Sequence, residues 1–278
     1  MRLLFTLVVL CAIGYGVWWL NEKHPDLKHK ALEIVNVNQF HALEPRFTSH
    51  QIMEKEFKEN LGTLSSPHPE SSLRFFPYLL LDVKFTDLSN QTAEGVMLWN
   101  LFDGEMVINT KDWEETHGFA DCIRAEAGPG EYKVLQALSS HGGQATHKEL
   151  LQSLNMGPAP LNAHIEHCLA KRLIVRHDHL YRIHLQTPNL HVQPITHLSV
   201  PFIPKQSKEG RERVPRRFSP FQIKKAAEAA FGSDFYIRNT QEIFVPVYLF
   251  SVQSEDGSMQ TLYFNGLNGK KVEPPASM

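Results

Sequence analysis

The sequence predicts an α+β fold in which one unit, a helix followed by an antiparallel meander, occurs twice and flanks a three-helix insert. Short motifs recur in the same order in two parts of the chain, which indicates a repeated folding unit. The segment between the copies has helical periodicity and ends in a hairpin pattern. An apolar run at the N-terminus predicts that a transmembrane helix precedes these units.

The run from Leu3 to Leu20 contains no charged residue and predicts a membrane anchor over residues 1–22. As a helix rising about 1.5 Å per residue, this run would span roughly 27 Å, close to the thickness of a bilayer core. A cleaved signal peptide is the alternative. Because the nearest small-x-small site, Ala12-Ile13-Gly14, is followed by the apolar Val17–Leu20, we favour an uncleaved anchor that contacts the lipid bilayer.

The charges on both sides of this run favour opposite orientations. Lys23, Lys28 and Lys30 favour a cytoplasmic body under the positive-inside rule. A very short N-terminus that carries Arg2 favours the reverse, as in a simple signal anchor. We expect a single-pass protein of a bacterial inner membrane with its body outside the cytoplasm.

The repeated unit is predicted over residues 28–110 and again over residues 218–273. Three short matches occur in the same order with small changes of offset, which chance rarely produces. The matches are Arg46-Phe47-Thr48 with Arg217-Phe218-Ser219, Pro77–Val83 with Pro246–Val252, and Asn100, Gly104 and Val107 with Asn265, Gly269 and Val272.

Each copy has the signals of one helix and three strands. In the second copy, Ser219 is a good N-cap, Pro220 suits the first helical position, and Gly232 suits the end of the helix. The strands follow from β-branched and aromatic runs separated by turn residues. The predicted elements are a helix at 48–60 and strands at 73–85, 94–102 and 106–109, then a helix from 219 and strands at 243–253, 259–264 and 270–272.

The second copy resembles the PepSY domain and related membrane-associated modules. The resemblance depends on Ser219-Pro220, Val247-Tyr248-Leu249, Asp256-Gly257 and the run from Tyr263 to Lys270. It implies an extracytoplasmic or membrane-linked binding module without catalytic residues. The first copy departs from the pattern, because Phe102-Asp103-Gly104 replaces the Asn-Gly-x-x-Gly turn. A generic αβββ sheet with ordinary turn glycines is the alternative.

Residues 131–186 predict an inserted domain of three helices and a hairpin. A capping box formed by Thr146 and Glu149 starts the second helix, and Pro160 opens the third. The stretch Val175–Arg182 then has the pattern of a hairpin. This order resembles a winged helix-turn-helix, a fold that serves protein contacts as well as DNA binding.

The third helix would enter the major groove if this domain bound DNA. Phosphate contacts need several Lys or Arg, whereas the outer face of this helix combines Lys171 with the carboxylate Glu166. We therefore expect contacts with another envelope or membrane protein, and keep a membrane-tethered DNA-binding regulator as the alternative. The candidate contact surface comprises His167, Lys171, Arg172, Arg176, His177, His179 and Arg182.

Three connecting segments complete the predicted organisation. Residues 111–130 form a linker that ends in Ala127-Gly128-Pro129-Gly130. Residues 187–217 are predicted as a strand pair on the second unit followed by a basic linker, for which anionic lipid binding is an alternative role. The tail, residues 274–278, is expected to fray.

The chain shows no catalytic or metal-binding motif that would name a reaction. The net charge of −2 argues against a whole-chain attraction to nucleic acid. His164, His167 and Cys168 share helical spacings, but a helical wheel directs Cys168 inward and His167 nearly opposite. Cys122 and Cys168 form one bridge or remain buried thiols, and we favour the thiols. We expect a non-enzymatic protein without a cofactor.

Overall fold

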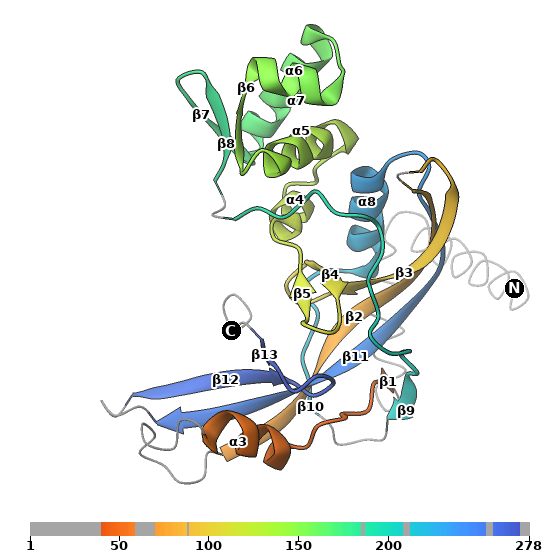
Figure 1. Ribbon diagram of the computed structural model, residues 1–278, viewed down its shortest axis with the longest axis vertical. Coiled ribbons are helices and arrows are strands. Elements are labelled where there is room, and N and C mark those ends of the chain that lie inside the picture. Colours follow the sequence, from red (N-terminus) through yellow and green to blue (C-terminus); the bar gives the residue numbers. More distant parts are fainter. Residues whose placement is uncertain are drawn as a thin grey trace, which may run out of the picture. The chain divides into compact units, whose positions relative to one another are not determined.

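A computed structural model describes residues 40–58, 70–87, 89–184, 187–207, 212–253 and 258–272, and it has the predicted α+β class (Figure 1). The expected membrane span Leu3–Leu20 lies outside the described residues. Within the described ranges, no helix is both long and apolar enough to cross a bilayer.

The predicted elements of both copies are present, with changes at their ends. The first copy contains α3 (Ser49–Lys58), β2 (Glu70–Thr86), β3 (Thr92–Asn100) and β4 (Met106–Asn109). The second contains α8 (Pro220–Phe231), β11 (Tyr236–Gln253), β12 (Met259–Asn265) and β13 (Lys271–Val272).

Strand β11 begins at Tyr236 rather than at the predicted residue 243. Its first residues are mostly polar and lack the apolar pattern of a buried strand. They are held as a strand because β2 lies opposite them, with Tyr236 facing Lys84 and Gln241 facing Leu80. Pairing with a neighbouring strand therefore overrides the local sequence signal.

The two copies join through their longest strands, β2 and β11, which pair antiparallel at the centre of one sheet. Phe76 lies opposite Val245, Pro77 opposite Phe244, and Pro246 opposite Phe75. Because Pro77 and Pro246 are matching residues of the repeat, this register has two-fold symmetry about Phe76 and Val245. The strand order is β13-β12-β11-β2-β3-β4-β5, where β5 is Glu114–Glu115.

Proline is unusual inside central strands because it cannot donate a ladder hydrogen bond. Pro77 and Pro246 lie where the neighbouring strands β3 and β12 end. Their carbonyls accept hydrogen bonds from Leu101 and Gly266 at 2.9 and 2.8 Å. The missing N–H groups therefore fall beyond the ladder, and both prolines are tolerated.

The helices are exchanged between the copies. Helix α8 of the second copy packs Ile223 and Ala227 into a core shared with Leu79, Leu81 and Trp99 of the first copy. Helix α3 of the first copy packs Ile52 against strands of the second copy, in a core that includes Tyr248, Phe250 and Phe264. Figure 1 shows α8 beside β3 and α3 beside β12. Neither copy therefore has a complete core of its own.

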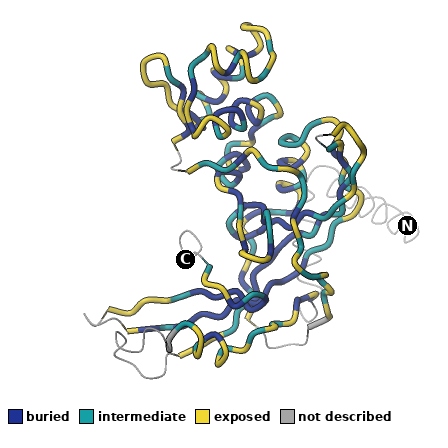
Figure 2. Tube along the Cα trace, viewed as in Figure 1, coloured by how far each residue is buried: buried dark blue, intermediate teal, exposed yellow. Residues whose placement is uncertain are grey.

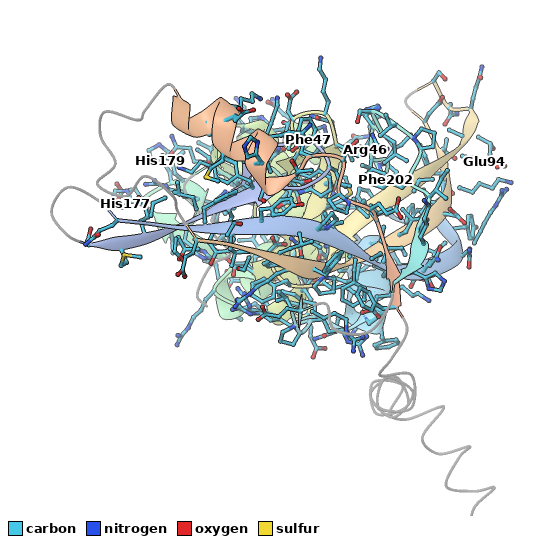
Figure 3. The ribbon with its side chains drawn as sticks, turned by 90° about the horizontal axis from the view of Figure 1, so that it is seen from below. Arg46, Phe47, Glu94, His177, His179 and Phe202 are labelled. Atoms are coloured by element: carbon cyan, nitrogen blue, oxygen red, sulfur yellow. The ribbon has the colours of Figure 1, made fainter. Side chains whose placement is uncertain are left out.

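The residues that precede each helix make the exchange with matching contacts. The N–H groups of Arg217 and Phe218 both donate to the carbonyl of Leu101 at 2.9 Å. The N–H groups of Arg46 and Phe47 donate to the carbonyl of Gly266 at 2.8 and 3.0 Å. Figure 3 shows Arg46 and Phe47 at the start of α3.

Two short strands also follow the symmetry. In β1 (Phe40–Ala42), Ala42 pairs in parallel with Phe244 of β11. In β10 (Glu212–Arg213), Arg213 pairs in parallel with Phe75 of β2. The predicted basic linker thus contributes a strand to the sheet through β10.

The insert contains α5 (Pro129–Ser140), β6 (Gln144–Thr146), α6 (His147–Leu154), α7 (Pro158–Ala170), β7 (Ile174–His177) and β8 (Leu180–Ile183). Its strands form a sheet in the order β6-β8-β7. Helix α7 begins at Pro158 rather than Pro160, with Gly157 as its N-cap, because the fixed φ of proline suits the first helical position. Helix α4 (Phe119–Arg124) and β5 lie in the segment predicted as a linker.

The return segment 187–203 differs from the strand pair expected on the second unit. It makes isolated bridges to the first copy and its linker, His197 with Asn109 and Asn189 with His117. Thr196 donates its N–H to Val96 at 2.7 Å, and its hydroxyl donates to the carbonyl of Val107 at 2.6 Å. Beyond it lies β9 (Lys205–Ser207).

The core runs from the sheet into the insert without a break. Buried residues of β2 and β3, of α8, and of helices α4, α5 and α7 belong to one apolar cluster. Phe119 of α4 is its junction, with ring centroids 5.0 Å from Trp99 and 5.8 Å from Tyr132. Figure 2 shows the buried residues along the central strands and through α5.

Candidate functional site

The hairpin formed by β7 and β8 presents most of the predicted contact residues. Asp178 has φ +54° and makes the tight turn between the strands. Arg176 donates from Nε to the carbonyl of Asp178 at 3.3 Å, and its guanidinium lies 5.8 Å from the centroid of Tyr181. His177 and His179, labelled in Figure 3, are exposed. The hairpin therefore has a tight turn at its tip and carries arginines along its strands.

An apolar side chain lies among these cations. Val175 is 48% exposed and pairs across the hairpin with Arg182, which is also exposed. Arg176 follows it on the same strand. Successive side chains of a strand alternate between its faces, so Arg176 points away from Val175, over Tyr181. An exposed β-branched residue opposite the Arg182 guanidinium combines apolar area with hydrogen-bond donors, as in the centre of many protein interfaces.

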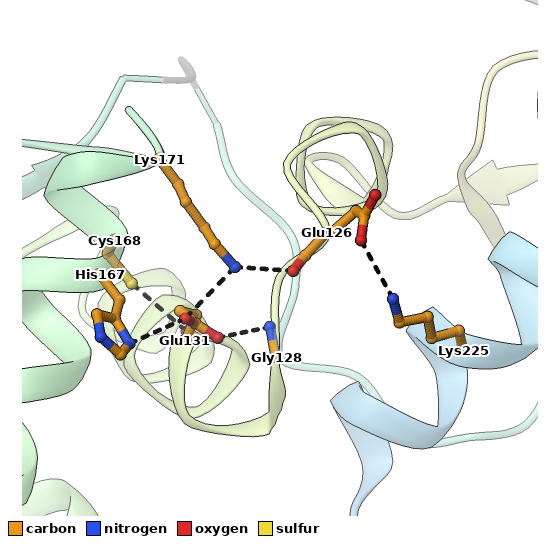
Figure 4. A network of polar contacts seen from close by, with 7 residues as sticks. All are labelled: Glu126, Gly128, Glu131, His167, Cys168, Lys171 and Lys225. Carbon is orange, nitrogen blue, oxygen red and sulfur yellow. Dashed lines mark hydrogen bonds and ion pairs between the residues drawn. The ribbon is translucent and has the colours of Figure 1, made fainter.

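Two predicted contact residues at the C-terminal end of α7, His167 and Lys171, lie beside the carboxylate of Glu131 (Figure 4). Lys171 donates from Nζ to the carbonyl of Glu126 at 2.8 Å and lies 3.5 Å from Oε1 of Glu131. His167 places Nδ1 3.4 Å from the same carboxylate oxygen. The side chain of Glu131 is only 8% exposed, so the Lys171 ammonium neutralises a largely buried charge.

The electrostatics of Glu131 follow from its surroundings. Burial alone would raise its pKa, but the Gly128 N–H and the Lys171 ammonium outweigh burial and hold the pKa below its usual value. Glu131 is thus ionised at neutral pH. Lys171 is engaged by this anion, and a nucleic acid phosphate would have to compete for it.

The same contacts extend to the second copy of the repeat. Lys225 of α8 places Nζ 3.2 Å from the carboxylate of Glu126, and Figure 4 shows both partners. Gln136 of α5 donates to the carbonyl of Ala230 at 3.1 Å. Glu126 therefore joins the C-terminal end of α7, the linker and α8.

The remaining predicted residue, Arg172, lies in the chain between α7 and β7. Arg172 follows α7 with φ +56° and is exposed. The structure thus separates the predicted surface into His167 and Lys171, which contact Glu131, and a second set made of Arg172 and the hairpin residues. Only the second set is free of the Glu131 contacts.

A cluster of carboxylates at the turn of the first copy is not among the site residues predicted from the sequence. Glu105 accepts hydrogen bonds from Thr116 Oγ1 at 2.8 Å and from the N–H groups of Gly118, Phe119 and Ala120 at 2.9 to 3.1 Å. It therefore caps the N-terminus of α4 from outside that helix, where a negative charge is favourable. Burial raises the pKa of Glu105 above its usual value.

Asp103 and Glu115 lie in the same cluster. Burial, helped by the Glu105 carboxylate, raises the pKa of Asp103 to about 7. Burial and then the Asp103 and Glu105 charges raise the pKa of Glu115 well above its usual value. Tyr78 donates to Glu115 at 3.3 Å. The available signal was an asymmetry of the repeat: acids flank Gly104, whereas Asn268 and Lys270 occupy the corresponding positions around Gly269.

The residues considered for metal binding point apart. Cys168 is fully buried, with Sγ 4.0 Å from the carbonyl of Glu131, whereas His167 is exposed. Across the described part of the chain, no group of three or more His, Cys, Asp or Glu is arranged to hold a metal ion. Cys122 and Cys168 are free and buried, as favoured from the sequence, and burial raises the pKa of Cys168 to about 12.

Comparisons with known proteins supply no relative. No family model, no curated protein and no solved structure matches the chain.

Proposed function

We propose that the chain is a non-enzymatic, membrane-anchored binding or scaffolding protein of the bacterial envelope, whose β7–β8 hairpin contacts another envelope protein. One observation carries the proposal. The hairpin presents Val175, 48% exposed, opposite the exposed Arg182, whereas Lys171, which follows α7, is engaged by Glu126 and Glu131. An apolar residue within a polar surround suits a protein partner better than a phosphate backbone.

The element order of the insert supports its assignment as a winged helix. Helix α5, strand β6, helices α6 and α7, and the hairpin β7–β8 follow one another, and the sheet has the order β6-β8-β7. The helix-plus-meander order of both copies supports a PepSY-like assignment. Both assignments, and the anchor over Leu3–Leu20, are part of the proposal.

The alternative is a membrane-tethered regulator whose winged helix binds DNA. Arg176 and Arg182 on the hairpin favour it, because wing cations can contact phosphates. The inward direction of Lys171 counts against it. It also requires a cytoplasmic body.

Site-specific photocrosslinking in native membranes tests the proposal. The full-length chain carries the crosslinker at Val175, or at Gln152 as a control on the exposed face of α6. We expect one adduct of defined mass from Val175, lost on Arg176→Ala plus Arg182→Ala, and none from Gln152. Equal adducts at both positions would contradict a specific contact at the hairpin.

A titration with duplex DNA distinguishes the DNA-binding regulator from the envelope binding protein. A DNA-binding regulator predicts salt-dependent binding that is lost on Lys171→Ala plus Arg176→Ala. The envelope proposal predicts no binding at low salt and no effect of the two substitutions.

A further inference from the structure

The outer edge of the sheet is open along part of β12. Strand β13 pairs with β12 only at Tyr263 and Phe264. Among the described residues, no strand pairs with the outer side of Met259–Leu262. Met259 is 67% exposed and Thr261 is exposed.

The direction of the edge groups follows from strand geometry. Asn265 donates its N–H outward, to Lys270 at 2.9 Å. In an antiparallel ladder, alternate residues point their N–H and C=O groups to the same side. Thr261 and Met259 therefore point both main-chain groups away from β11, where no described residue bonds them.

The matching edge in the first copy is closed. Thr196 donates to the carbonyl of Val96 at 2.7 Å, and Ile195 covers Gly95 so closely that a Cβ there would lie 2.9 Å from its Cδ1. Glu94 accepts two hydrogen bonds of 2.7 Å from Arg238. Charge and coverage are the devices that keep sheet edges from pairing. Met259–Leu262 carries no charge, and no strand among the described residues covers its outer edge.

We infer that this edge is a dimerisation surface, at which β12 pairs antiparallel with β12 of a second copy of the chain. The two-fold axis passes at Gln260, so Thr261 of one copy lies opposite Met259 of the other. Each such pair exchanges both of its outward main-chain hydrogen bonds. Gln260 lies opposite its own symmetry mate.

Two observations favour a second copy over another partner. Met259–Leu262 carries no charge, so identical edges meet without repulsion, and its outward residues are placed symmetrically about Gln260. The chain also pairs matching strands in this way internally, where β2 and β11 cross their two-fold axis at Phe76 and Val245.

The C-terminal sequence is poorly suited to occupy the edge itself. Val272 lies opposite Tyr263, so continuing that register would place Pro274 opposite Thr261. Proline has no N–H to donate to the Thr261 carbonyl. A strand from a second copy supplies both the donor and the acceptor.

Disulfide trapping tests the register. The full-length chain, with Cys11→Ser and in mild detergent, carries either Gln260→Cys or the control Thr92→Cys, an exposed residue of the matching edge. At a non-hydrogen-bonded pair on the axis the two Cβ atoms approach closely enough for a disulfide. We expect a covalent dimer from Gln260→Cys alone; equal or no crosslinking at the two positions overturns the inference.

Sedimentation of Thr261→Pro against Thr261→Val tests the hydrogen bonds. Proline is tolerated on an edge whose N–H faces outward, so the monomer keeps its fold, which circular dichroism checks. Each dimer loses two hydrogen bonds, and we expect its Kd to rise about tenfold or more, with little change for Thr261→Val. A monomeric wild type, or a dimer unaffected by proline, overturns the inference.

Discussion

The turns that end the two copies share their main-chain geometry and differ in their side chains. In both, the Asn side-chain carbonyl accepts from the N–H two residues on: Asn100 from Phe102 at 2.9 Å, and Asn265 from Leu267 at 2.8 Å. Gly104 and Gly269 both have positive φ, +89° and +68°. The backbone of the turn is thus common to the copies, and the differences lie in what each turn contacts.

The side-chain contacts of the two Asn residues show this difference. The amide of Asn100 donates to Asp103 and to Tyr78. The corresponding amide nitrogen of Asn265 is buried and has no hydrogen-bond partner in the described part of the structure, because Val247 stands where the first copy has Tyr78. The first turn is therefore linked by side chains to Tyr78 of β2, whereas the second is linked to residues 110–112, through Asn268 and Lys270.

The largest expected effect concerns the phenylalanine that precedes each exchanged helix. Phe218 is 4% exposed, whereas Phe47 is only partly buried. We expect Phe218→Ala to lower the free energy of unfolding by about 3–5 kcal/mol and Phe47→Ala by about 2 kcal/mol. Urea unfolding measures both, and equal losses would show that the two exchanges are energetically equivalent.

The turn glycines should follow next. A Cβ on Gly104 would lie 2.7 Å from the Phe218 ring, and one on Gly269 would lie 3.0 Å from the Phe47 ring. An alanine at either position adds backbone strain and overpacks the ring. We therefore expect the free energy of unfolding to fall by about 3 kcal/mol for Gly104→Ala and by about 2 kcal/mol for Gly269→Ala.

Gly142 is the matched control for these substitutions. Its φ is +71°, but nothing lies within 4 Å of a Cβ built there. Gly142→Ala should therefore cost only the strain, about 1 kcal/mol. If Gly142→Ala lowered the free energy of unfolding as much as Gly104→Ala, contact with the Phe218 ring would play no part in the effect.

The acidic turn of the first copy predicts a pH dependence. The pKa of Asp103 is about 7 in the folded chain, against about 3.9 when unfolded, so the folded state holds a proton that the unfolded state has lost. Stability is highest below the unfolded pKa and falls as pH rises towards 7. Between pH 5 and 8 the free energy of unfolding falls for both proteins. For Asp103→Asn this fall should be smaller than for the wild type by on the order of 1–2 kcal/mol.

Urea unfolding at several pH values measures this slope, with Asn268→Asp as the reciprocal variant in the second copy. The cationic Lys270 follows Asn268 where Glu105 follows Asp103, so Asn268→Asp should leave the slope nearly unchanged. If the free energy of unfolding changed with pH equally in the wild type and in Asp103→Asn, Asp103 would not be the source of the pH dependence.

The smallest effect concerns the helix caps, where the copies agree. The hydroxyls of Thr48 and Ser219 each accept a hydrogen bond of 3.3 Å from the N–H three residues later. In turn, Oε1 of Gln51 and of Gln222 accepts a hydrogen bond of 2.9 Å from the N–H of Thr48 and of Ser219. We expect Thr48→Ala and Ser219→Ala to cost about 1 kcal/mol each in thermal unfolding. A difference of more than twofold would break the equivalence of the two helix starts.

What the sequence predicted correctly depends on local signals. The caps at Thr146 and Ser219, the turn at Gly104 and the periodicity of the helices fall within a few residues of the elements they predict. The α+β class follows from them. Helix α4 was missed because its cap, Glu105, is separated from Gly118 in sequence and acts across the fold.

The contacts of the predicted site residues also depend on groups that are distant in sequence. Lys171 was predicted to be outward-facing from its position on a helical wheel, yet Glu126 and Glu131 draw it inward. The exchange of α3 and α8 between the copies is likewise invisible to periodicity, because a helical pattern shows which face is buried but not which strands cover it.

The exchange also sets an order of events during synthesis. Strands β2 and β3 leave the ribosome early, but the helix that covers them, α8, is made only after the whole insert. Until then the apolar face around Leu79, Leu81 and Trp99 lacks its cover. Contacts so distant in sequence slow folding and prolong the exposure of apolar surface. This apolar face therefore stays uncovered while the chain from the end of β3 to the end of α8, nearly half of the protein, is synthesised.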